Sequence, residues 1–328
     1  MLKQLLSDLR AYSGIQSKQQ IATSSQALAG AFPSPYPNGD DTAAMKTNDG
    51  YDLLATEGFL PAFVEKDPWF AGWCGVMVNV SDIAAMGGRP VGVVNSIWGQ
   101  DNETMSRVFQ GMVAASNAFQ VPILGGHTNL DTRAPYLSVS ILGKAQTLLS
   151  SFSAQPEQAI VAAIDLRGEF RQPFLNWNAA TSSPAERLRG DLKLLPKIAE
   201  ERLAFAAKDI SQAGLLGTCL MLLESSNLGA EVTLDAIPKP SAVSWENWLR
   251  AFPSFGYLFT TSKENVSSLV ALFDSRGIAA SQIGHTHSGS ALTVHSQGET
   301  AIFWDLQDEP LTGINEHTQT CSTDTQHA

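Results

Sequence analysis

The chain has 328 residues, of which 44% are hydrophobic and 16% charged, a composition typical of globular proteins large enough for more than one core. The net charge is 21 − 32 = −11 and no basic cluster interrupts the acidic balance, which argues against nucleic acid or an anionic membrane surface as a partner. No stretch reaches the roughly 18 apolar residues of a membrane span, no signal-peptide run opens the chain, and three scattered cysteines suit a reducing compartment, so we expect a cytoplasmic protein.

The first 35 residues predict a helical lead-in. Leu2, Leu6 and Leu9 recur at helical spacing, and the pattern breaks near Ser13 and Gly14, which indicates two short helices. Three prolines at positions 33, 35 and 37 then predict an extended segment.

Acidic residues flank the first predicted strands, which cover residues 42–46 and 51–56 around an Asn-Asp-Gly turn. Asp40 and Asp41 precede the first strand, and Glu57 ends the second. Side chains at strand ends can converge without unwinding an element, so these acids are candidate ligands for a cation.

A helix of about 19 residues is predicted between Asp67 and Pro90. Asp67 is a natural N-cap, Pro68 fits the first helical position, and Gly87 can take the left-handed conformation that ends a helix.

Two faces of this helix differ in character. One face is apolar and predicts core packing through Trp69, Phe70, Trp73, Val76, Met77, Val80 and Ile83. Asn79 and Asp82 lie one turn apart on another face, together with Gly72 and Gly75. Asp82 taken alone is more typical of a solvated or capping carboxylate.

The remainder of the first domain is predicted as a strand at 90–98, a helix from Asn102, a strand at 121–124 and a strand at 136–143. This α+β order closes an N-terminal domain near residue 147, and residues 148–156 are predicted to form a linker. Gly125 and Gly126 follow a strand, where they could present backbone N–H groups to phosphate or simply form a tight turn.

A second domain is predicted over residues 157–310, and residues 311–328 are predicted to be a disordered tail. It begins with a strand at 159–165, contains helical pattern from Ala185 to about Phe205, and places Asp209 just before the next helix. Ser262 is predicted to cap a later helix, and strands between 281 and 305 complete the domain.

An aperiodic loop of about 18 residues at 166–183 is long for a compact domain, and such loops are often functional. It offers charged, aromatic and amide groups for a substrate: Arg167, Arg171, Asn176, Trp177 and Asn178. The alternative is a surface loop with arginines lying along it and one buried tryptophan. His285 and His287 share a strand face, which is compatible with a metal but more typical of an ordinary strand.

Three motifs resemble one known superfamily in both order and spacing. They are N-V-S-D-I-A-A-M-G-G-R-P around Asp82, G-D-D-T-A-A at 39–44 and G-G-H-T at 125–128, and the match extends over roughly residues 35–290. The chain thereby resembles aminoimidazole ribonucleotide (AIR) synthase, thiamine-monophosphate kinase, selenophosphate synthetase and the hydrogenase-maturation dehydratase. The resemblance implies an α+β fold with α/β layers and two domains. It also implies an N-terminal mixed sheet that pairs into a barrel in a homodimer, and a C-terminal α/β sandwich.

The resemblance implies ATP and Mg²⁺ as cofactors and a small, acidic or amide-bearing metabolite as substrate, to which phosphate is transferred or which phosphate activates. The metal ligands that it implies are Asp40, Asp41, Glu57, Asp82 and Asp209. The nucleotide-binding residues that it implies are Asn79, Asp82, Gly125, Gly126 and His127.

The chain departs from the kinase members at two positions, because His127 and Gln212 stand where those members have acids. A non-catalytic nucleotide-binding protein or scaffold homodimer is therefore the alternative to an ATP-using kinase, ligase or cyclase. The sequence identifies neither the substrate nor a general base.

Overall fold

The computed structural model describes residues 1–28, 36, 38–99 and 102–314 of the chain. Two compact units are present, which we call the seven-stranded unit and the five-stranded unit after their sheets. The seven-stranded unit comprises Met1–Asp40, Leu149–Ala179 and Glu201–Ala328, and the five-stranded unit comprises Asp41–Leu148 and Ala180–Glu200. The predicted fold class, an α+β protein with mixed sheets and helices, is confirmed.

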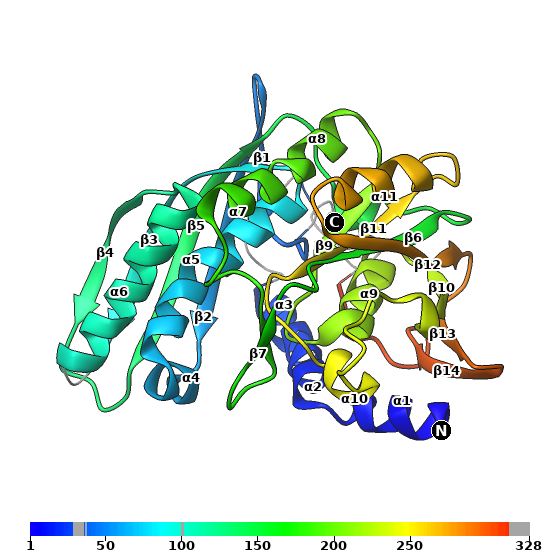
Figure 1. Ribbon diagram of the computed structural model, residues 1–328, viewed down its shortest axis with the longest axis horizontal. Coiled ribbons are helices and arrows are strands. Elements are labelled where there is room, and N and C mark those ends of the chain that lie inside the picture. The colour runs from blue at the N-terminus through cyan, green and yellow to red at the C-terminus, as the bar shows by residue number, and fades with distance from the viewer. Residues whose placement is uncertain (29–35, 37, 100–101, 315–328) are drawn as a thin grey trace, which may run out of the picture. The chain divides into compact units, whose positions relative to one another are not determined.

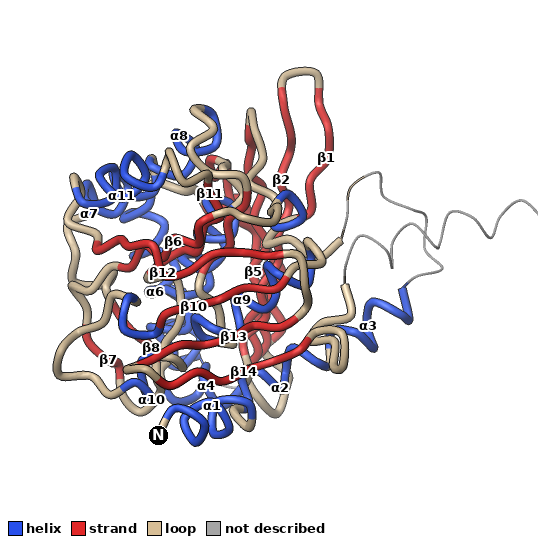
Figure 2. Tube along the Cα trace, turned by 90° about the vertical axis from the view of Figure 1, so that its right-hand side faces the viewer, coloured by secondary structure: helices blue, strands red, loops and turns tan. Residues whose placement is uncertain are grey.

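The sheet of the five-stranded unit has the order β1-β2-β5-β3-β4, and only β3 and β4 run parallel. Its strands are β1 (Ala43–Thr47), β2 (Gly50–Phe59), β3 (Arg89–Trp98), β4 (Ile123–Asn129) and β5 (Tyr136–Ala145). The β1–β2 hairpin forms one edge, with its turn projecting outward (Figure 2). The predicted strand at 121–124 was too short, because β4 continues through the glycine pair to Asn129.

Two long helices, α5 (Pro68–Ala85) and α6 (Asn102–Phe119), lie side by side on one face of this sheet (Figure 1). The predicted cap of α5 is confirmed, since Asp67 Oδ1 accepts a hydrogen bond from Phe70 N at 3.3 Å. Shorter helices complete the unit: α4 (Pro61–Lys66), α7 (Ala185–Leu192) and α8 (Leu194–Glu200). Helical structure therefore ends at Glu200, earlier than the predicted Phe205.

The predicted glycine-lined polar face of α5 is wrong, because these glycines are packing contacts. A Cβ at Gly72 would lie 2.0 Å from Val108 O of α6, and a Cβ at Gly75 would lie 2.9 Å from a methyl carbon of Val139 in β5. Almost the whole helix is buried, and glycine allows its backbone to approach both neighbours closely.

The sheet of the seven-stranded unit has the order β14-β13-β10-β12-β6-β11-β9. Its strands are β6 (Ala159–Ile164), β9 (Ala206–Asp209), β10 (Gly229–Thr233), β11 (Gly256–Thr261), β12 (Ala279–His287), β13 (Ala291–Ser296) and β14 (Glu299–Asp305). Helices α9 (Gly214–Ser225) and α11 (Val266–Asp274) cover opposite faces of this sheet (Figure 1). Successive side chains of β11 point to opposite faces of the sheet and so pack against different helices. Leu258 belongs to the core that contains α9, while the adjacent Phe259 packs against Phe273 of α11.

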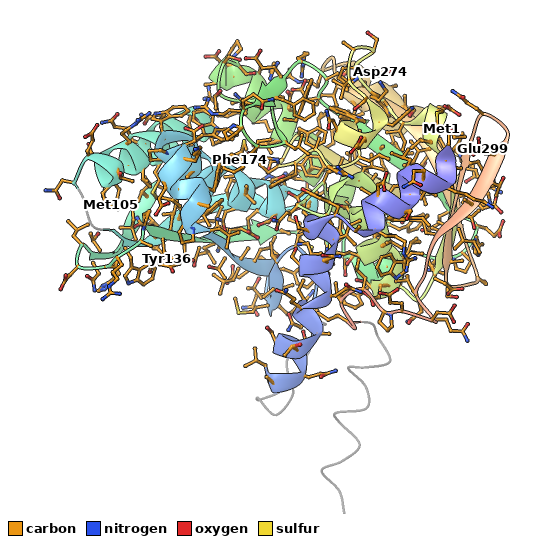
Figure 3. The ribbon with its side chains drawn as sticks, turned by 90° about the horizontal axis from the view of Figure 1, so that it is seen from below. Met1, Met105, Tyr136, Phe174, Asp274 and Glu299 are labelled. Carbon is orange, nitrogen blue, oxygen red and sulfur yellow. The ribbon has the colours of Figure 1, made fainter. Side chains whose placement is uncertain are left out.

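The lead-in consists of three helices, α1 (Leu2–Arg10), α2 (Ser13–Gln19) and α3 (Ile21–Leu28), and it belongs to the seven-stranded unit. Its assignment to the N-terminal domain was therefore wrong. Leu2, Leu6 and Leu9 enter the core formed with α9, and the Met1 amino group lies 3.4 Å from Glu299 of β14 (Figure 3). The burial of Leu2, Leu6 and Leu9 in this core decides which unit the lead-in belongs to, although the five-stranded unit follows it directly in the sequence.

Short elements occupy segments that were predicted to be irregular. The 166–183 loop contains the hairpin β7 (Glu169–Arg171) and β8 (Asn176–Asn178), and the predicted linker contains the 3₁₀ turn η1 (Ser151–Ser153). Two more short helices are η2 (Leu234–Ala236) and α10 (Trp245–Trp248). The predicted Ser262 cap is wrong, because α11 begins four residues later behind Asn265.

The predicted disordered tail is wrong for its first four residues, Leu311 to Ile314: three of them are at most 9% exposed, and the fourth, Gly313, donates from its N–H to Glu224 at 3.0 Å. Residues 315–328 lie outside the described part of the chain. No helix among the described residues is both long enough and apolar enough to cross a bilayer.

Candidate functional site

Asp40 is the most fully connected of the predicted metal ligands in the seven-stranded unit. Its carboxylate accepts hydrogen bonds from Ser150 Oγ at 2.5 Å, from Ser151 N at 2.7 Å and from Ser151 Oγ. Burial raises the pKa of Asp40, and the nearby Lys208 ammonium and the serine hydrogen bonds oppose that rise. The η1 turn thus holds an acid whose charge is partly compensated from within the unit.

Asp209 lies beside the same turn, at the C-terminal end of β9. Lys208 and Asp209 are 3% and 4% exposed, and the preceding residue, Ala207, donates from its N–H to Leu149 O at 3.3 Å. The structure therefore brings Asp40 and the end of β9 to one edge of the seven-stranded unit. Helix α9 begins only at Gly214, five residues after Asp209, so the acid ends a strand as well as preceding a helix.

The remaining predicted acids, Asp41, Glu57 and Asp82, belong to the five-stranded unit. Asp82 lies in the last turn of α5 and is 5% exposed, although its side chain is an ionisable carboxyl group. Glu57 pairs in register with Val139 and has the strand parity of the buried Leu53, so it is on the face of β2 that α5 covers. Asp41 precedes β1 and is partly exposed.

Asn79 has a packing role. It is completely buried, and its side-chain N–H₂ donates to Gly75 O at 2.8 Å and to Val139 O at 3.0 Å. The bond to Val139 O joins α5 to β5, whereas the bond to Gly75 O stays within α5. The nucleotide contact of Asn79 stays a prediction.

The glycine pair lies in β4, an exposed edge strand, in contrast to the turn that the sequence favours. A Cβ at Gly126 would lie 2.6 Å from Asn95 O, which is a packing reason for glycine at this position. Gly125 has open space around it, and His127 is exposed. Because an edge strand leaves alternate backbone N–H groups unpaired by the sheet, β4 can still donate to an anion.

Three of the predicted substrate residues, Arg167, Asn176 and Trp177, are held or covered by the fold. Arg167 forms a bidentate pair with Asp165, at 2.7 and 3.2 Å, and its remaining terminal nitrogen donates to Arg276 O at 2.9 Å. Trp177 is 4% exposed, its ring packs edge-on against Trp248 at 4.9 Å between centroids, and Asn176 is also 4% exposed. The predicted stacking role of Trp177 is wrong, since the core covers its ring.

Arg171 and Asn178, from the same β7–β8 hairpin, are only partly buried and stay candidates for substrate contact. Arg171 pairs in register with Asn176, and Asn178 pairs with Glu169. The hairpin is anchored by Trp177 N–H, which donates to Phe252 O at 2.8 Å. Arg171 and Asn178 are therefore the two residues of this hairpin that stay candidates for substrate contact, and the hairpin itself is held in place by the bond to Phe252.

The donor set has the chemistry of a magnesium site, because every predicted ligand is a carboxylate and hard divalent cations prefer oxygen. Within the described residues, however, no group of three or more His, Cys, Asp or Glu side chains is arranged to hold a metal ion. His285 is no exception: its Nε2 atom lies 4.0 Å from Glu231, in a contact between neighbouring strands.

Both units match models of one protein family. Residues 39–145 match the N-terminal domain, and residues 167–297 the C-terminal domain, of AIR synthase related proteins. The chain belongs to the AIR synthase related family. The sequence resemblance to this family is therefore confirmed.

Individual AIR synthase related proteins give the extent of the similarity. An uncharacterized protein of Synechocystis is 43% identical over 320 residues, covering 96% of this chain and 99% of its own. A selenide, water dikinase of Myxococcus xanthus is 25% identical over 250 residues, or 71% of each chain. The structure of Thermotoga maritima PurL complexed with ATP superimposes with a TM-score of 0.68 at 19% identity, over 85% of this chain. This chain spans only 46% of that PurL chain.

Several residues beside the family motifs were not found by sequence reasoning. Ser150 and Ser151 lie in the predicted linker, Lys208 precedes Asp209, and Glu224 occupies the apolar pattern of α9. Lys208 could have been found, because a lysine next to the apolar residues of A-A-K-D indicates a charged side chain on a buried strand. The two serines gave no such signal, because their pairing with Asp40 depends on contacts across 110 residues.

Proposed function

We propose that this protein is a Mg²⁺-dependent, ATP-using enzyme that phosphorylates or activates a small acidic or amide-bearing metabolite. The observation that carries the proposal is that two acids in segments that match the family, Asp82 and Asp209, are buried. Asp82 is 5% exposed and Asp209 is 4% exposed, and each lies within a segment that matches the family. Burial of a carboxylate is costly, so sites that retain several are typical of cation binding or catalysis.

Relatives support the nucleotide part of the proposal. The selenide, water dikinase is named for a phosphate-transferring reaction, and the Thermotoga maritima protein was crystallised with ATP. The location in the cytoplasm that we expect from the sequence agrees with this proposal and stays a prediction.

The proposed ligands of Mg²⁺ are Asp40 and Asp209 in the seven-stranded unit and Asp41, Glu57 and Asp82 in the five-stranded unit. When bound, the ion neutralises the charge of the triphosphate. The chain's own contribution is mainly positioning, as is usual in phosphoryl transfer. A backbone N–H group of β4 at the Gly125–Gly126 pair would orient the phosphates, with His127 beside it, and Arg171 would pair with an acidic substrate.

The test is the variant Asp82→Asn, studied by titration calorimetry with ATP in the presence and absence of Mg²⁺. Loss of one negative charge weakens the ion, and the triphosphate then faces the remaining acids unscreened. We expect Mg²⁺-dependent ATP affinity to fall by about two orders of magnitude or more, with little change in thermal stability.

A matched control is Asp52→Asn, which removes the same charge from β2 but involves a surface pair with Lys144 at 3.7 Å. This control should bind ATP like the wild type. A change of less than about threefold in Asp82→Asn would contradict a ligand role for Asp82.

A non-catalytic nucleotide-binding or scaffold function is the second candidate, and the departures at His127 and Gln212 favour it. Both residues are exposed, so neither substitution is explained by core packing. Thermal-shift screening of metabolites with ATP and Mg²⁺ separates the two, because a ligand at 100 times its dissociation constant adds about 2.7 kcal/mol of stability. An enzyme should then convert ATP in the presence of the stabilising metabolite, whereas a scaffold should not.

A further inference from the structure

A buried glutamate at the end of α9, Glu224, has no part in the proposed function. It is 4% exposed, and its carboxylate accepts four hydrogen bonds from the C-terminal segment. Oε1 accepts from the N–H groups of Leu311 at 2.9 Å and Gly313 at 3.0 Å. Oε2 accepts from the N–H of Thr312 at 2.7 Å and from its hydroxyl at 2.6 Å. Consecutive backbone N–H groups that converge on one carboxylate form a strong, charge-assisted anchor.

We call residues Leu311 to Ile314 the C-terminal strap, and its last residue packs against Gly39. A Cβ at Gly39 would lie 2.6 Å from Ile314 Cγ2, and the φ angle of Gly39 is +127°, which side-chain-bearing residues rarely adopt. Ile314 is 9% exposed and donates from its N–H to Thr312 Oγ1 at 3.3 Å. The strap therefore fixes the residue directly before Asp40.

The same end of α9 also fixes the partners of Asp40. Ser226, which follows α9, donates to Ser151 O at 2.6 Å and accepts from Ala154 N at 3.1 Å. Ser151 in turn donates twice to the Asp40 carboxylate. Asp40 is thus connected to α9 by two routes, one through η1 and one through the strap and Gly39.

We infer that Glu224 is a positioning residue for Asp40, acting through the C-terminal strap to set the Gly39–Asp40 backbone for binding of Mg²⁺ and ATP. The functional part of this inference rests on the proposed function above. A buried charge is weak evidence for stability, because an apolar residue of similar size often stabilises as well. What Glu224 provides, and an apolar residue could not, is a defined position for three backbone N–H groups next to Gly39.

The test compares Glu224→Gln with the wild type and with Glu231→Gln, an exposed glutamate of β10 in the same unit. A glutamine places N–H₂ against backbone N–H groups, so at least one bond is lost and the strap should loosen. Titration calorimetry, well below the melting temperature, should show about tenfold weaker Mg²⁺-dependent ATP binding in Glu224→Gln and no change in Glu231→Gln. A purely structural role would lower the melting temperature and leave the affinity of the folded protein unchanged, and that result would overturn the inference.

Amide hydrogen exchange gives a readout that needs no nucleotide. The backbone amide of Ser151, which donates to Asp40 Oδ1 at 2.7 Å, should exchange about tenfold faster in Glu224→Gln than in the wild type or Glu231→Gln. Unchanged exchange would overturn the inference even if the wild type bound no ATP, whereas faster exchange without ATP binding would contradict only the proposed function. If Glu224→Gln does not fold, Ile314→Ala applies the same test, because it retains the anchor and removes the contact with Gly39.

Discussion

At the scale of single residues, arginines in one short segment have different roles. Arg167 is held by Asp165 and by a backbone carbonyl, so its guanidinium supports the fold. Arg171 lies on the hairpin that Trp177 anchors, where a partly exposed cation can meet a ligand. The support of Arg167 by Asp165 and Arg276 depends on the folded arrangement, which the sequence does not show.

We predict that Arg167→Ala lowers the free energy of unfolding by about 1–2 kcal/mol, because it breaks three hydrogen bonds at a partly exposed site. Affinity for ATP and substrate should stay unchanged. Arg171→Ala is the matched comparison, for which we expect weaker binding of an acidic substrate. Denaturant unfolding and calorimetry measure both properties, and loss of substrate binding in Arg167→Ala at full stability would contradict this division.

The Cys219 thiol should be unreactive in the native protein. Burial raises the pKa of this thiol to about 12, so at pH 8 only about one molecule in ten thousand carries the reactive thiolate. Unfolding returns the pKa toward its ordinary value and should increase labelling by iodoacetamide by about three orders of magnitude. Peptide mass spectrometry of native and urea-unfolded samples measures this, and rapid native labelling at Cys219 would contradict it.

Residue-level prediction from sequence succeeded where the determinant is local. The cap of α5 depends on Asp67 and the three residues that follow, and it was predicted correctly. The burial of Trp177 and the pairing of Asp40 with Ser150 depend on residues far away in sequence, and neither pattern nor composition carries that information.

At the scale of elements, the α5–α6 pair is the best-defined packing unit of the five-stranded unit. The two helices approach through reciprocal glycines: a Cβ at Gly72 would lie 2.0 Å from Val108 O, and one at Gly111 would lie 1.9 Å from Trp69 O. Helix α5 also carries Asp82, so the distance between these helices bears on the position of a candidate ligand.

Gly72→Ala tests this packing because two effects have opposite signs. Helix propensity alone would stabilise the variant by about 1 kcal/mol. The new methyl group meets backbone atoms of α6, however, and overpacking of this kind costs about 1–3 kcal/mol or more, so we expect net destabilisation. Gly58→Ala is the control, since no atom lies within 4 Å of a Cβ there, and it should unfold like the wild type. Equal denaturation midpoints for the two variants would contradict close helix packing.

Hydrophobic periodicity predicted most helices and strands because each element buries one face. It failed where an element lacks a buried face, as in β4, whose residues are exposed after Ile123. It also failed at helix ends such as Ser262, where the preceding turn imitates a cap and the helix begins only at Val266.

At the scale of the whole molecule, each unit contains segments that are far apart in the sequence. The lead-in joins the seven-stranded unit, whereas residues 180–200 join the five-stranded unit. Arg89 at the start of β3 pairs with Glu200 at the end of α8, at 2.6 and 3.2 Å, which fastens that second segment. Sequence reasoning identified a break near residue 147 but could not assign these segments, because their partners lie more than 100 residues away.

The last prediction concerns the homodimer that we propose. The face of the five-stranded sheet opposite α5 exposes Met45, Leu54, Val94 and Tyr136, each between 45% and 48% exposed. Apolar residues gathered on one sheet face mark an interaction surface, and pairing two such faces removes them from water. We therefore expect light scattering to show a dimer at micromolar concentration.

Val94→Lys should shift this protein to the monomer, because the dimer would bury an unpaired ammonium between two sheets at a cost of several kcal/mol. Val113→Lys is the matched control: Val113 is 51% exposed, close to the 45% of Val94, but it lies on α6, which covers the other face of the sheet. The control should remain dimeric. A monomeric wild type, or two variants with the same molar mass, would contradict pairing through the open face. If Val94→Lys is monomeric and still binds ATP like the wild type, pairing serves stability and does not build the nucleotide site.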